Sequence, residues 1–213
     1  MRQLVVLLAL AVISACSGPR IETGDLLFVG IPADYVPGKG TAEEAISQAT
    51  AKEGELNLIH TAILERTPDD GIMVIDATFA YNVDRHPLDT LKKQFTLEGG
   101  KSPVFIVKRL KKGFRPEFID NARKYIGQKY DYSFMPGNDE QYCTELVQVS
   151  YLEPDGTPIF PSAPMNFKNA DGVIPEYWDW LFSRLGIPVP QDVPGTNPQD
   201  MFASPRLKEV MRF

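Results

Sequence analysis

The chain has 213 residues, 43% of them apolar, and a formal net charge of −6 at pH 7. This length and apolar content suit one domain with a sizeable core. An acidic chain with only short basic runs is not expected to bind nucleic acid. Its two cysteines and two histidines show no CxxC or HxxxH spacing, so we expect no metal and no other cofactor.

The first 15 residues have the pattern of a signal peptide. A short basic start precedes an apolar stretch over residues 4–12, which is too short to span a bilayer. The small residues before Cys16 resemble a bacterial lipobox, in which the cysteine is lipidated. A plain signal peptide with an incidental cysteine is the alternative. We therefore expect a tether over residues 16–23 and a lipid anchor in the outer membrane on its periplasmic face, because Ser17 rather than Asp follows the cysteine.

Local patterns predict both strands and helices along the mature chain. Thr41 and Glu44 have the spacing of a capping box, and the turn over residues 68–71 joins two apolar runs as an antiparallel hairpin. The predicted elements in chain order are a buried strand over 24–30, a helix from 41 to about 52, strands over 56–65 and 72–78, a helix over 88–95, a strand over 102–110, helices over 115–126 and 142–153, a helix after Pro175 that ends at Gly186, and a short helix near Leu207.

Two further expectations concern side chains outside the predicted core. His86 precedes Pro87 in a charged stretch and is expected at the surface. The aromatic residues of the helix after Pro175 are expected to pack rather than to form a binding stripe, and they are Tyr177, Trp178, Trp180 and Phe182.

Cys143 opens a predicted helix, and this position favours a reactive thiol. The positive end of the helix dipole stabilises a thiolate, which is the nucleophilic form of cysteine. If lipid modifies Cys16, Cys143 has no partner for an intramolecular disulfide in an exported protein, and catalysis is one explanation for such a lone thiol. The alternative is a small buried apolar residue, the usual place of a free cysteine.

His60 and Asp76 lie within the two apolar strands of the predicted hairpin. Polar groups in such strands require partners. If both side chains point to one face of the sheet, Asp76 orients the imidazole while His60 faces the thiol of Cys143. Nucleophile, base and orienting group would then form a triad for acyl transfer. A one-residue slip in register would separate them, and the alternatives are a satisfied core histidine and a turn-capping aspartate.

Short motifs in this order resemble the circularly permuted NlpC/P60 proteins, in their YiiX/YaeF-like branch. The motifs are Gly-Asp-Leu-Leu-Phe-Val from residue 24, Ile-His-Thr-Ala-Ile from 59, Val-Ile-Asp-Ala from 74, Gly-Gln-Lys-Tyr-Asp from 127 and Tyr-Cys-Thr-Glu-Leu-Val from 142. The resemblance implies an α+β, papain-like fold with an antiparallel sheet packed against helices. It covers about residues 24–153, and the tail more loosely. We expect a catalytic domain over residues 24–165, with a helical, Pro-rich extension over 166–213 packed on that domain.

The resemblance also assigns roles to individual residues. Cys143 matches the family nucleophile, His60 the base and Asp76 the third polar position, where many members have Glu, Asn or His. Tyr130 matches a tyrosine near the nucleophile, and together with Tyr142 it is expected at the substrate and oxyanion position. Other matched residues carry no catalytic expectation, since Thr144 replaces a common serine and Glu145 is expected to be structural.

Three functions remain open at this stage. The first is a cell-envelope cysteine peptidase or amidase that acts on short peptides, with peptidoglycan as one source of them. The second is a lipid-directed enzyme of the lecithin:retinol acyltransferase-like type, which an apolar groove beside Cys143 would support. The third is a non-catalytic envelope lipoprotein, in which Cys143 lies more than about 5 Å from His60.

Overall fold

The computed structural model describes residues 19–213 except 36–37, 39, 51–54, 70 and 98–100. The predicted signal peptide and Cys16 therefore lie outside the described residues. The helices are α1 (Ala42–Thr50), α2 (Leu88–Gln94), α3 (Glu117–Arg123), α4 (Cys143–Ser150), α5 (Glu176–Leu185) and α6 (Pro198–Phe202). The strands are β1 (Leu26–Pro32), β2 (Leu56–Arg66), β3 (Ile72–Thr78), β4 (Asn82–Pro87), β5 (Val104–Leu110), β6 (Ala163–Pro164), β7 (Pro194–Gly195) and β8 (Leu207–Arg212).

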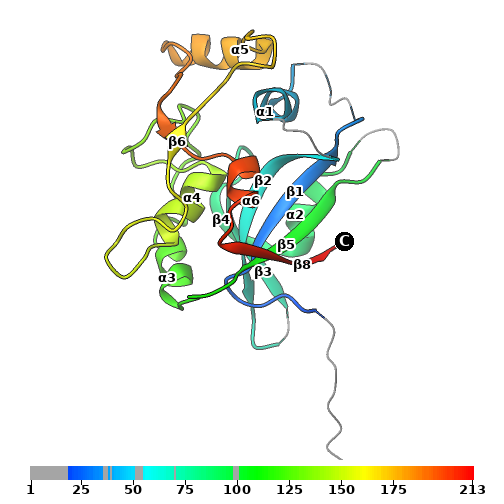
Figure 1. Cartoon of the computed structure of the whole chain (residues 1–213), viewed down its shortest axis with the longest axis vertical. Coiled ribbons are helices and arrows are strands. Elements are labelled where there is room, and N and C mark those ends of the chain that lie inside the picture. The colour runs from blue at the N-terminus through cyan, green and yellow to red at the C-terminus, as the bar shows by residue number, and fades with distance from the viewer. Residues whose placement is uncertain (1–18, 36–37, 39, 51–54, 70, 98–100) are drawn as a thin grey trace, which may run out of the picture.

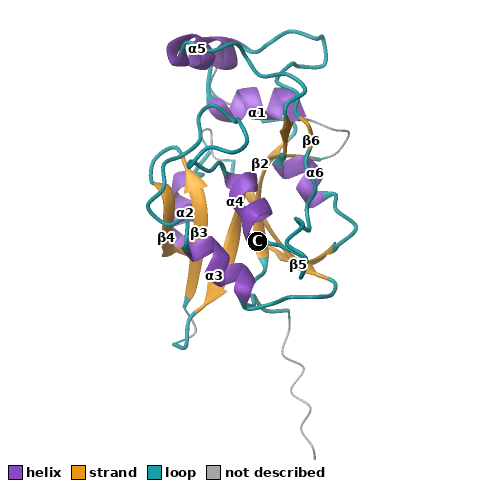
Figure 2. Cartoon of the chain, turned by 90° about the vertical axis from the view of Figure 1, so that its left-hand side faces the viewer, coloured by secondary structure: helices purple, strands orange, loops and turns teal. Residues whose placement is uncertain are grey.

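A six-stranded sheet in the order β4-β3-β2-β1-β5-β8 forms the centre of the molecule, and all its neighbouring strands are antiparallel. In Figure 1, α3 and α4 lie to the left of the sheet, and α1 and α5 lie above it. Figure 2 shows α3 and α4 stacked along the face of the sheet that is turned to the viewer. This arrangement confirms the α+β class and the antiparallel sheet packed against helices. None of the described helices combines the length and apolar character that crossing a membrane requires.

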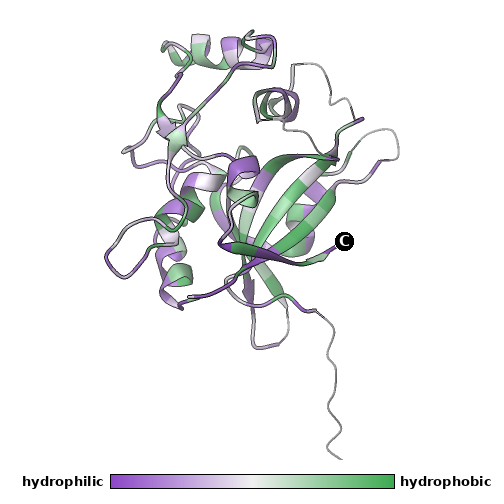
Figure 3. Cartoon of the chain, viewed as in Figure 1, coloured by the Kyte–Doolittle hydropathy of each residue, from purple (hydrophilic) through white to green (hydrophobic). Residues whose placement is uncertain are grey.

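Strand β1 shows why the sequence forms a sheet that is buried on both faces. Its residues alternate between two apolar clusters: Leu26 and Phe28 pack with α3 and α4, while Leu27 and Val29 pack with Leu91 of α2. A strand covered on both sides has no polar face, so it reads as a continuous apolar run. The central strands accordingly form the hydrophobic centre of Figure 3.

Helix α1 begins at the predicted N-cap, although only half of the capping box forms. Thr41 Oγ1 accepts a hydrogen bond from the backbone N–H of Glu44 (3.2 Å), which satisfies one of the free donors of the first turn. The carboxylate of Glu44 accepts from the backbone N–H of Gly40 instead of that of Thr41. The helix therefore starts where the sequence predicted, with a slightly different set of hydrogen bonds.

Two segments differ from the predicted elements. The short helix expected near Leu207 is wrong, since this segment is β8, which pairs with the outer edge of β5. The stretch from Asn82 to Pro87 is strand β4, which pairs with β3 at the other edge of the sheet. In both places pairing with an open sheet edge outweighs weak local preferences. The expected extension over 166–213 thus contributes a strand to the central sheet.

The aromatic residues of α5 pack as predicted, with one exception. Trp178 and Phe182 are buried and contact Phe134 and Phe167. The indole N–H of Trp178 donates to the backbone carbonyl of Ala45 in α1 (3.3 Å). This bond ties α5 to α1, whereas the ring of Trp180 is 52% exposed.

Phe118 provides a test of the core between α3 and the sheet. Its ring is fully buried and stacks on Tyr151 with centroids 4.6 Å apart. We expect Phe118→Ala to lower the free energy of unfolding in urea by roughly 3–5 kcal/mol, because a cavity replaces the ring. Phe114→Ala is the matched control, since that ring is 42% exposed, and it should cost no more than about 1 kcal/mol. Equal losses in the two variants would contradict this account of the core.

Candidate active site

The thiol of Cys143 lies at the first position of α4, after Tyr142, whose backbone is extended. Cys143 is a free cysteine and is buried. In the same first turn of the helix, burial and the nearby charge of Asp131 raise the pKa of Glu145 to about 8. Glu145 is therefore mostly protonated at neutral pH and places little negative charge beside the thiol. The unpaired N–H groups of the helix start remain to favour an anion there.

The register of the sheet places His60 and Asp76 on one face. Leu64 of β2 and His86 of β4 both pair with Val74 of β3. Because side chains alternate along a strand, His60 and Asp76 lie on the same face as this row. The register that the proposed triad requires is therefore present.

A bulge in β2 brings His60 toward Cys143. The pairing of β1 with β2 shifts by one residue between Val29 and Gly30, which leaves Ile59 without a partner on β1. Adjacent residues of a regular strand point to opposite faces, but a bulge redirects one of them. Ile59 and His60 accordingly line the same cavity beside Cys143.

The imidazole of His60 bonds Asp76 and shares a cavity lining with Cys143. Its Nε2 donates to Asp76 Oδ2 (2.8 Å), so Nδ1 is the nitrogen available to the thiol. Burial opposes a charge on His60, but hydrogen bonds with Asp76 and Cys143 outweigh it and raise the pKa of His60 to about 9. Phe95 lies against the imidazole ring with centroids 4.9 Å apart. The three predicted residues thus meet in the order thiol, imidazole, carboxylate.

The surface position predicted for His86 is wrong. The residue is only 6% exposed, and its Nε2 lies 3.0 Å from Asp76 Oδ1. Burial acts to raise the pKa of Asp76, but hydrogen bonds from His60 and His86 hold it below its usual range. Sequence reasoning missed this residue because it did not recognise β4, although the turn-favouring Asn82 at its start and Pro87 at its end were signals of an edge strand.

The two tyrosines expected at the oxyanion position have different surroundings. Tyr130 is buried and lines the cavities on both sides of Cys143. Burial and the neighbouring thiol raise the pKa of Tyr130 well above its usual value, so its hydroxyl keeps a proton to donate. The hydroxyl of Tyr142 accepts from the backbone N–H of Thr196 (3.0 Å) and lies 3.7 Å from the sulfur of Met165. Tyr142 therefore anchors the C-terminal segment, and Tyr130 is the better placed donor.

Two narrow cavities, about 50 and 40 Å³ in volume, lie beside Cys143. The side chains of Cys143 and Tyr130 line both of them. The first has α1 on one side and the C-terminal segment on the other, and apolar side chains dominate its lining. These side chains are Ile46, Ile59, Phe134, Met165, Phe167 and Trp178. No Asp, Glu, Lys or Arg of the described residues lines this first cavity, whereas Glu43 lines the second. The thiol thus lies beside a slender apolar space.

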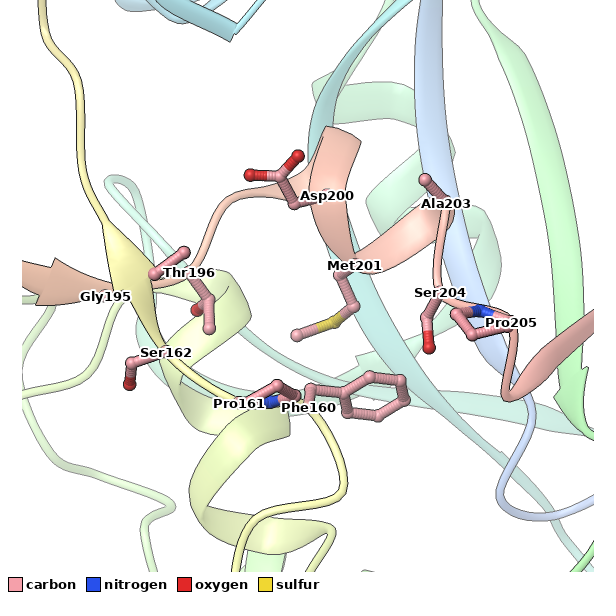
Figure 4. A pocket seen from close by; sticks show the side chains of 11 residues that line it. Phe160, Pro161, Ser162, Gly195, Thr196, Asp200, Met201, Ala203, Ser204 and Pro205 are labelled. Atoms are coloured by element: carbon pink, nitrogen blue, oxygen red, sulfur yellow. The ribbon is translucent and has the colours of Figure 1, made fainter.

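A further cavity of about 320 Å³ lies between the loop that contains Phe160 and the short helix α6. Figure 4 shows the side chains of Phe160 and Met201 in this cavity, with Asp200 near its upper edge. Thr196 lines this cavity and also the first cavity beside Cys143. None of the three predicted catalytic residues lines it, so it is separate from the thiol.

The raised pKa of His60 predicts a pH dependence of stability. A histidine whose folded pKa exceeds its unfolded value near 6.5 stabilises the fold fully below about pH 6.5 and loses that contribution as pH rises through about 9. We expect the difference in unfolding free energy between wild type and His60→Gln to fall by up to roughly 3 kcal/mol between pH 6 and 10. Urea unfolding at several pH values measures this difference, and a constant difference would refute the prediction.

The six-stranded sheet and the cysteine helix define a papain-like fold in a permuted order, because the histidine strand precedes the cysteine helix. Residues 20–211 match the family described as permuted papain-like amidase enzymes, YaeF/YiiX, C92 family. The chain belongs to this family. The predicted YiiX-like relationship and papain-like fold are confirmed, and the matching family is named as papain-like amidases rather than as NlpC/P60 proteins.

Two relatives from Escherichia coli agree with this assignment. The uncharacterized protein YiiX of strain K12 is 29% identical over 124 residues, which are 56% of this chain and 60% of that protein. The chain thus matches less than two thirds of the length of this relative. The crystal structure of the metalloprotein yiiX from strain O157:H7 has a TM-score of 0.65 at 24% identity, covering 90% of this chain and 97% of the other. At this identity the likeness shows the fold alone.

Our expectation of no metal is contradicted by the description of that relative as a metalloprotein. In the part of the chain that the structure describes, no three His, Cys, Asp or Glu side chains are grouped to hold a metal ion. Both oxygens of Asp76 are already occupied by imidazole nitrogens. The described residues as arranged do not fit a metal.

Proposed function

We propose that the protein is a cysteine amidase that cleaves an amide bond through an acyl-enzyme on Cys143. The single observation that supports this most is the hydrogen-bonded series of Cys143, His60 and Asp76. His60 bonds Asp76 through Nε2 at 2.8 Å, which leaves Nδ1 for the thiol, and interactions with Cys143 help to raise the pKa of His60. Nucleophile, base and orienting carboxylate are the groups that covalent acyl transfer requires.

The first half of the reaction forms the acyl-enzyme. The sulfur of Cys143 bonds to the carbonyl carbon, and the oxygen of the resulting tetrahedral intermediate accepts hydrogen bonds from the Cys143 backbone N–H and the Tyr130 hydroxyl. Protonated His60 then gives its proton to the leaving nitrogen, and the carbon–nitrogen bond breaks.

The second half regenerates the thiol. Neutral His60 takes a proton from water, and the hydroxide adds to the thioester carbon. The carbon–sulfur bond then breaks to release a carboxylic acid, and sulfur and imidazolium form a pair again. Asp76 keeps the imidazole in the tautomer and orientation that both halves need.

The substrate we propose is a short amide at the cell envelope, with peptidoglycan-derived peptides as one source. Its proposed location rests on the signal-peptide pattern and on the expected lipidation of Cys16. The apolar lining of the first cavity favours a second candidate, an enzyme that acts on lipid acyl esters or amides. A slender acyl chain would meet apolar side chains there, whereas the amine and carboxylate of a free peptide would meet no charged partner.

Trapping of the acyl-enzyme tests this function. The purified protein is incubated with muropeptides, N-acyl amino acids of increasing chain length and long-chain acyl esters, then quenched in acid and analysed by mass spectrometry. We expect an acyl adduct on the peptide that contains Cys143, lost in Cys143→Ala and retained in the matched control Cys16→Ser. Adducts from long acyl donors alone would select the second candidate. If no donor gives an adduct or turnover, both enzymatic candidates fail.

A further inference from the structure

The proposed mechanism gives no role to His86, a buried titratable side chain in direct contact with the triad. His86 on β4 is 6% exposed and bonds Asp76 Oδ1 through Nε2 (3.0 Å), while the other oxygen of Asp76 holds His60 (2.8 Å). One carboxylate therefore lies between the only two histidines of the chain. An orienting group that serves His60 alone would not need the second ring.

Both ring nitrogens of His86 face hydrogen-bond acceptors. Nε2 faces the carboxylate of Asp76, and Nδ1 lies 3.3 Å from the backbone carbonyl of Pro87. A carboxylate and a carbonyl supply no proton, so each nitrogen must donate, and only the protonated imidazole has two N–H groups. The hydrogen bond that His86 donates to Asp76 outweighs burial and raises the pKa of His86 above its usual value, in agreement with this geometry.

We propose that His86 is a positively charged positioning residue, which holds Asp76 in place and partly neutralises its charge. This inference rests on the proposed function. In the arrangement that we propose, charges alternate along the hydrogen-bonded residues: negative sulfur, positive His60, negative Asp76 and positive His86. A buried carboxylate with no second partner would hold the proton of His60 more strongly, yet His60 must release that proton to the leaving group in each cycle. His86 weakens that hold while fixing the carboxylate in place.

The groups around His86 favour this charge from more than one element. Asp76 faces it from β3, and Asp84 on its own strand adds a further negative charge that raises the pKa of His86. The ring of Tyr81, from the turn between β3 and β4, lies 6.2 Å away between centroids. Arg85, the neighbouring residue on β4, donates instead to Glu65 (2.8 Å).

Nitrogen-15 NMR of histidine-labelled protein tests the proposal directly, because His60 and His86 are the only two histidines. At pH 7 we expect two protonated ring nitrogens for His86. His86→Gln keeps an N–H donor for Asp76 but removes the charge, so the titration of His60 should move upward by roughly one pH unit. His86→Ala removes the donor as well, and alkylation of Cys143 should slow on the order of tenfold.

Arg85→Gln is the matched control, since it removes a positive charge from the same strand without touching Asp76. It should leave the titration of His60 and the alkylation of Cys143 unchanged. A neutral His86 at pH 7, or a His60 titration that is the same in wild type and His86→Gln, would overturn the proposal. If His86→Ala does not fold, the protonation of His86 in the wild-type spectrum and the titration of His60 in His86→Gln still test the proposal. A different outcome would refute the proposed function alone: His86 is charged and shifts the titration of His60, but Cys143 is unreactive.

Discussion

Replacing His60 with Ala is expected to slow alkylation of Cys143 by iodoacetamide at pH 6.5 by on the order of 30-fold. An unassisted thiol is only a few per cent ionised near neutral pH, whereas a protonated imidazole beside it stabilises the reactive thiolate. His60 is in place for this role, because hydrogen bonds with Asp76 and Cys143 raise its pKa to about 9. The rate is measured by mass spectrometry on the peptide that contains Cys143, so that Cys16 does not contribute.

Glu43→Gln is the control for this measurement. Glu43 lines the cavity that contains His60 and Cys143, so the variant changes a nearby charge without removing a group of the proposed triad. Its alkylation rate should stay within about twofold of wild type. A His60→Ala protein that reacts as fast as wild type would show that the imidazole does not activate the thiol. The non-catalytic reading would then be preferred.

Replacing Asp76 with Ala is expected to lower the free energy of unfolding by roughly 3–5 kcal/mol, because two buried imidazoles lose their shared partner. The carboxylate is 1% exposed and holds His60 at 2.8 Å and His86 at 3.0 Å. Asp76→Asn keeps one acceptor and should cost less, roughly 1–3 kcal/mol. Both values are measured by urea unfolding at pH 7.

Asp84→Ala is the matched control for this pair of variants. Asp84 lies directly opposite Asp76 in the pairing of β3 with β4, but it is partly exposed. The variant should change stability by less than about 1 kcal/mol. If Asp76→Ala costs no more than Asp84→Ala, the two histidines do not depend on the carboxylate, and the orienting role of Asp76 fails with it.

Much of the site followed from local patterns. The apolar runs of β2 and β3 and the Asp-Gly turn between them predicted the hairpin that carries His60 and Asp76. The cysteine before an apolar helical stretch predicted the start of α4. These features depend on residues close in the chain, so periodicity and turn chemistry were sufficient. The same patterns could not exclude a shift in register, which the pairing of three strands resolved.

The sequence by itself determined the buried strands, the hairpin, the cysteine helix and the residues of the candidate triad, because each is encoded by neighbours in the chain. Only the tertiary structure decided the rest. The bulge at Ile59 depends on β1, the charge on His86 depends on Asp76 from the adjacent strand, and β8 forms only because β5 offers an open edge. The apolar cavity beside Cys143 likewise needs α1 and the C-terminal segment on either side. Contacts between distant segments leave no local periodicity, and so only the assembled fold could define them.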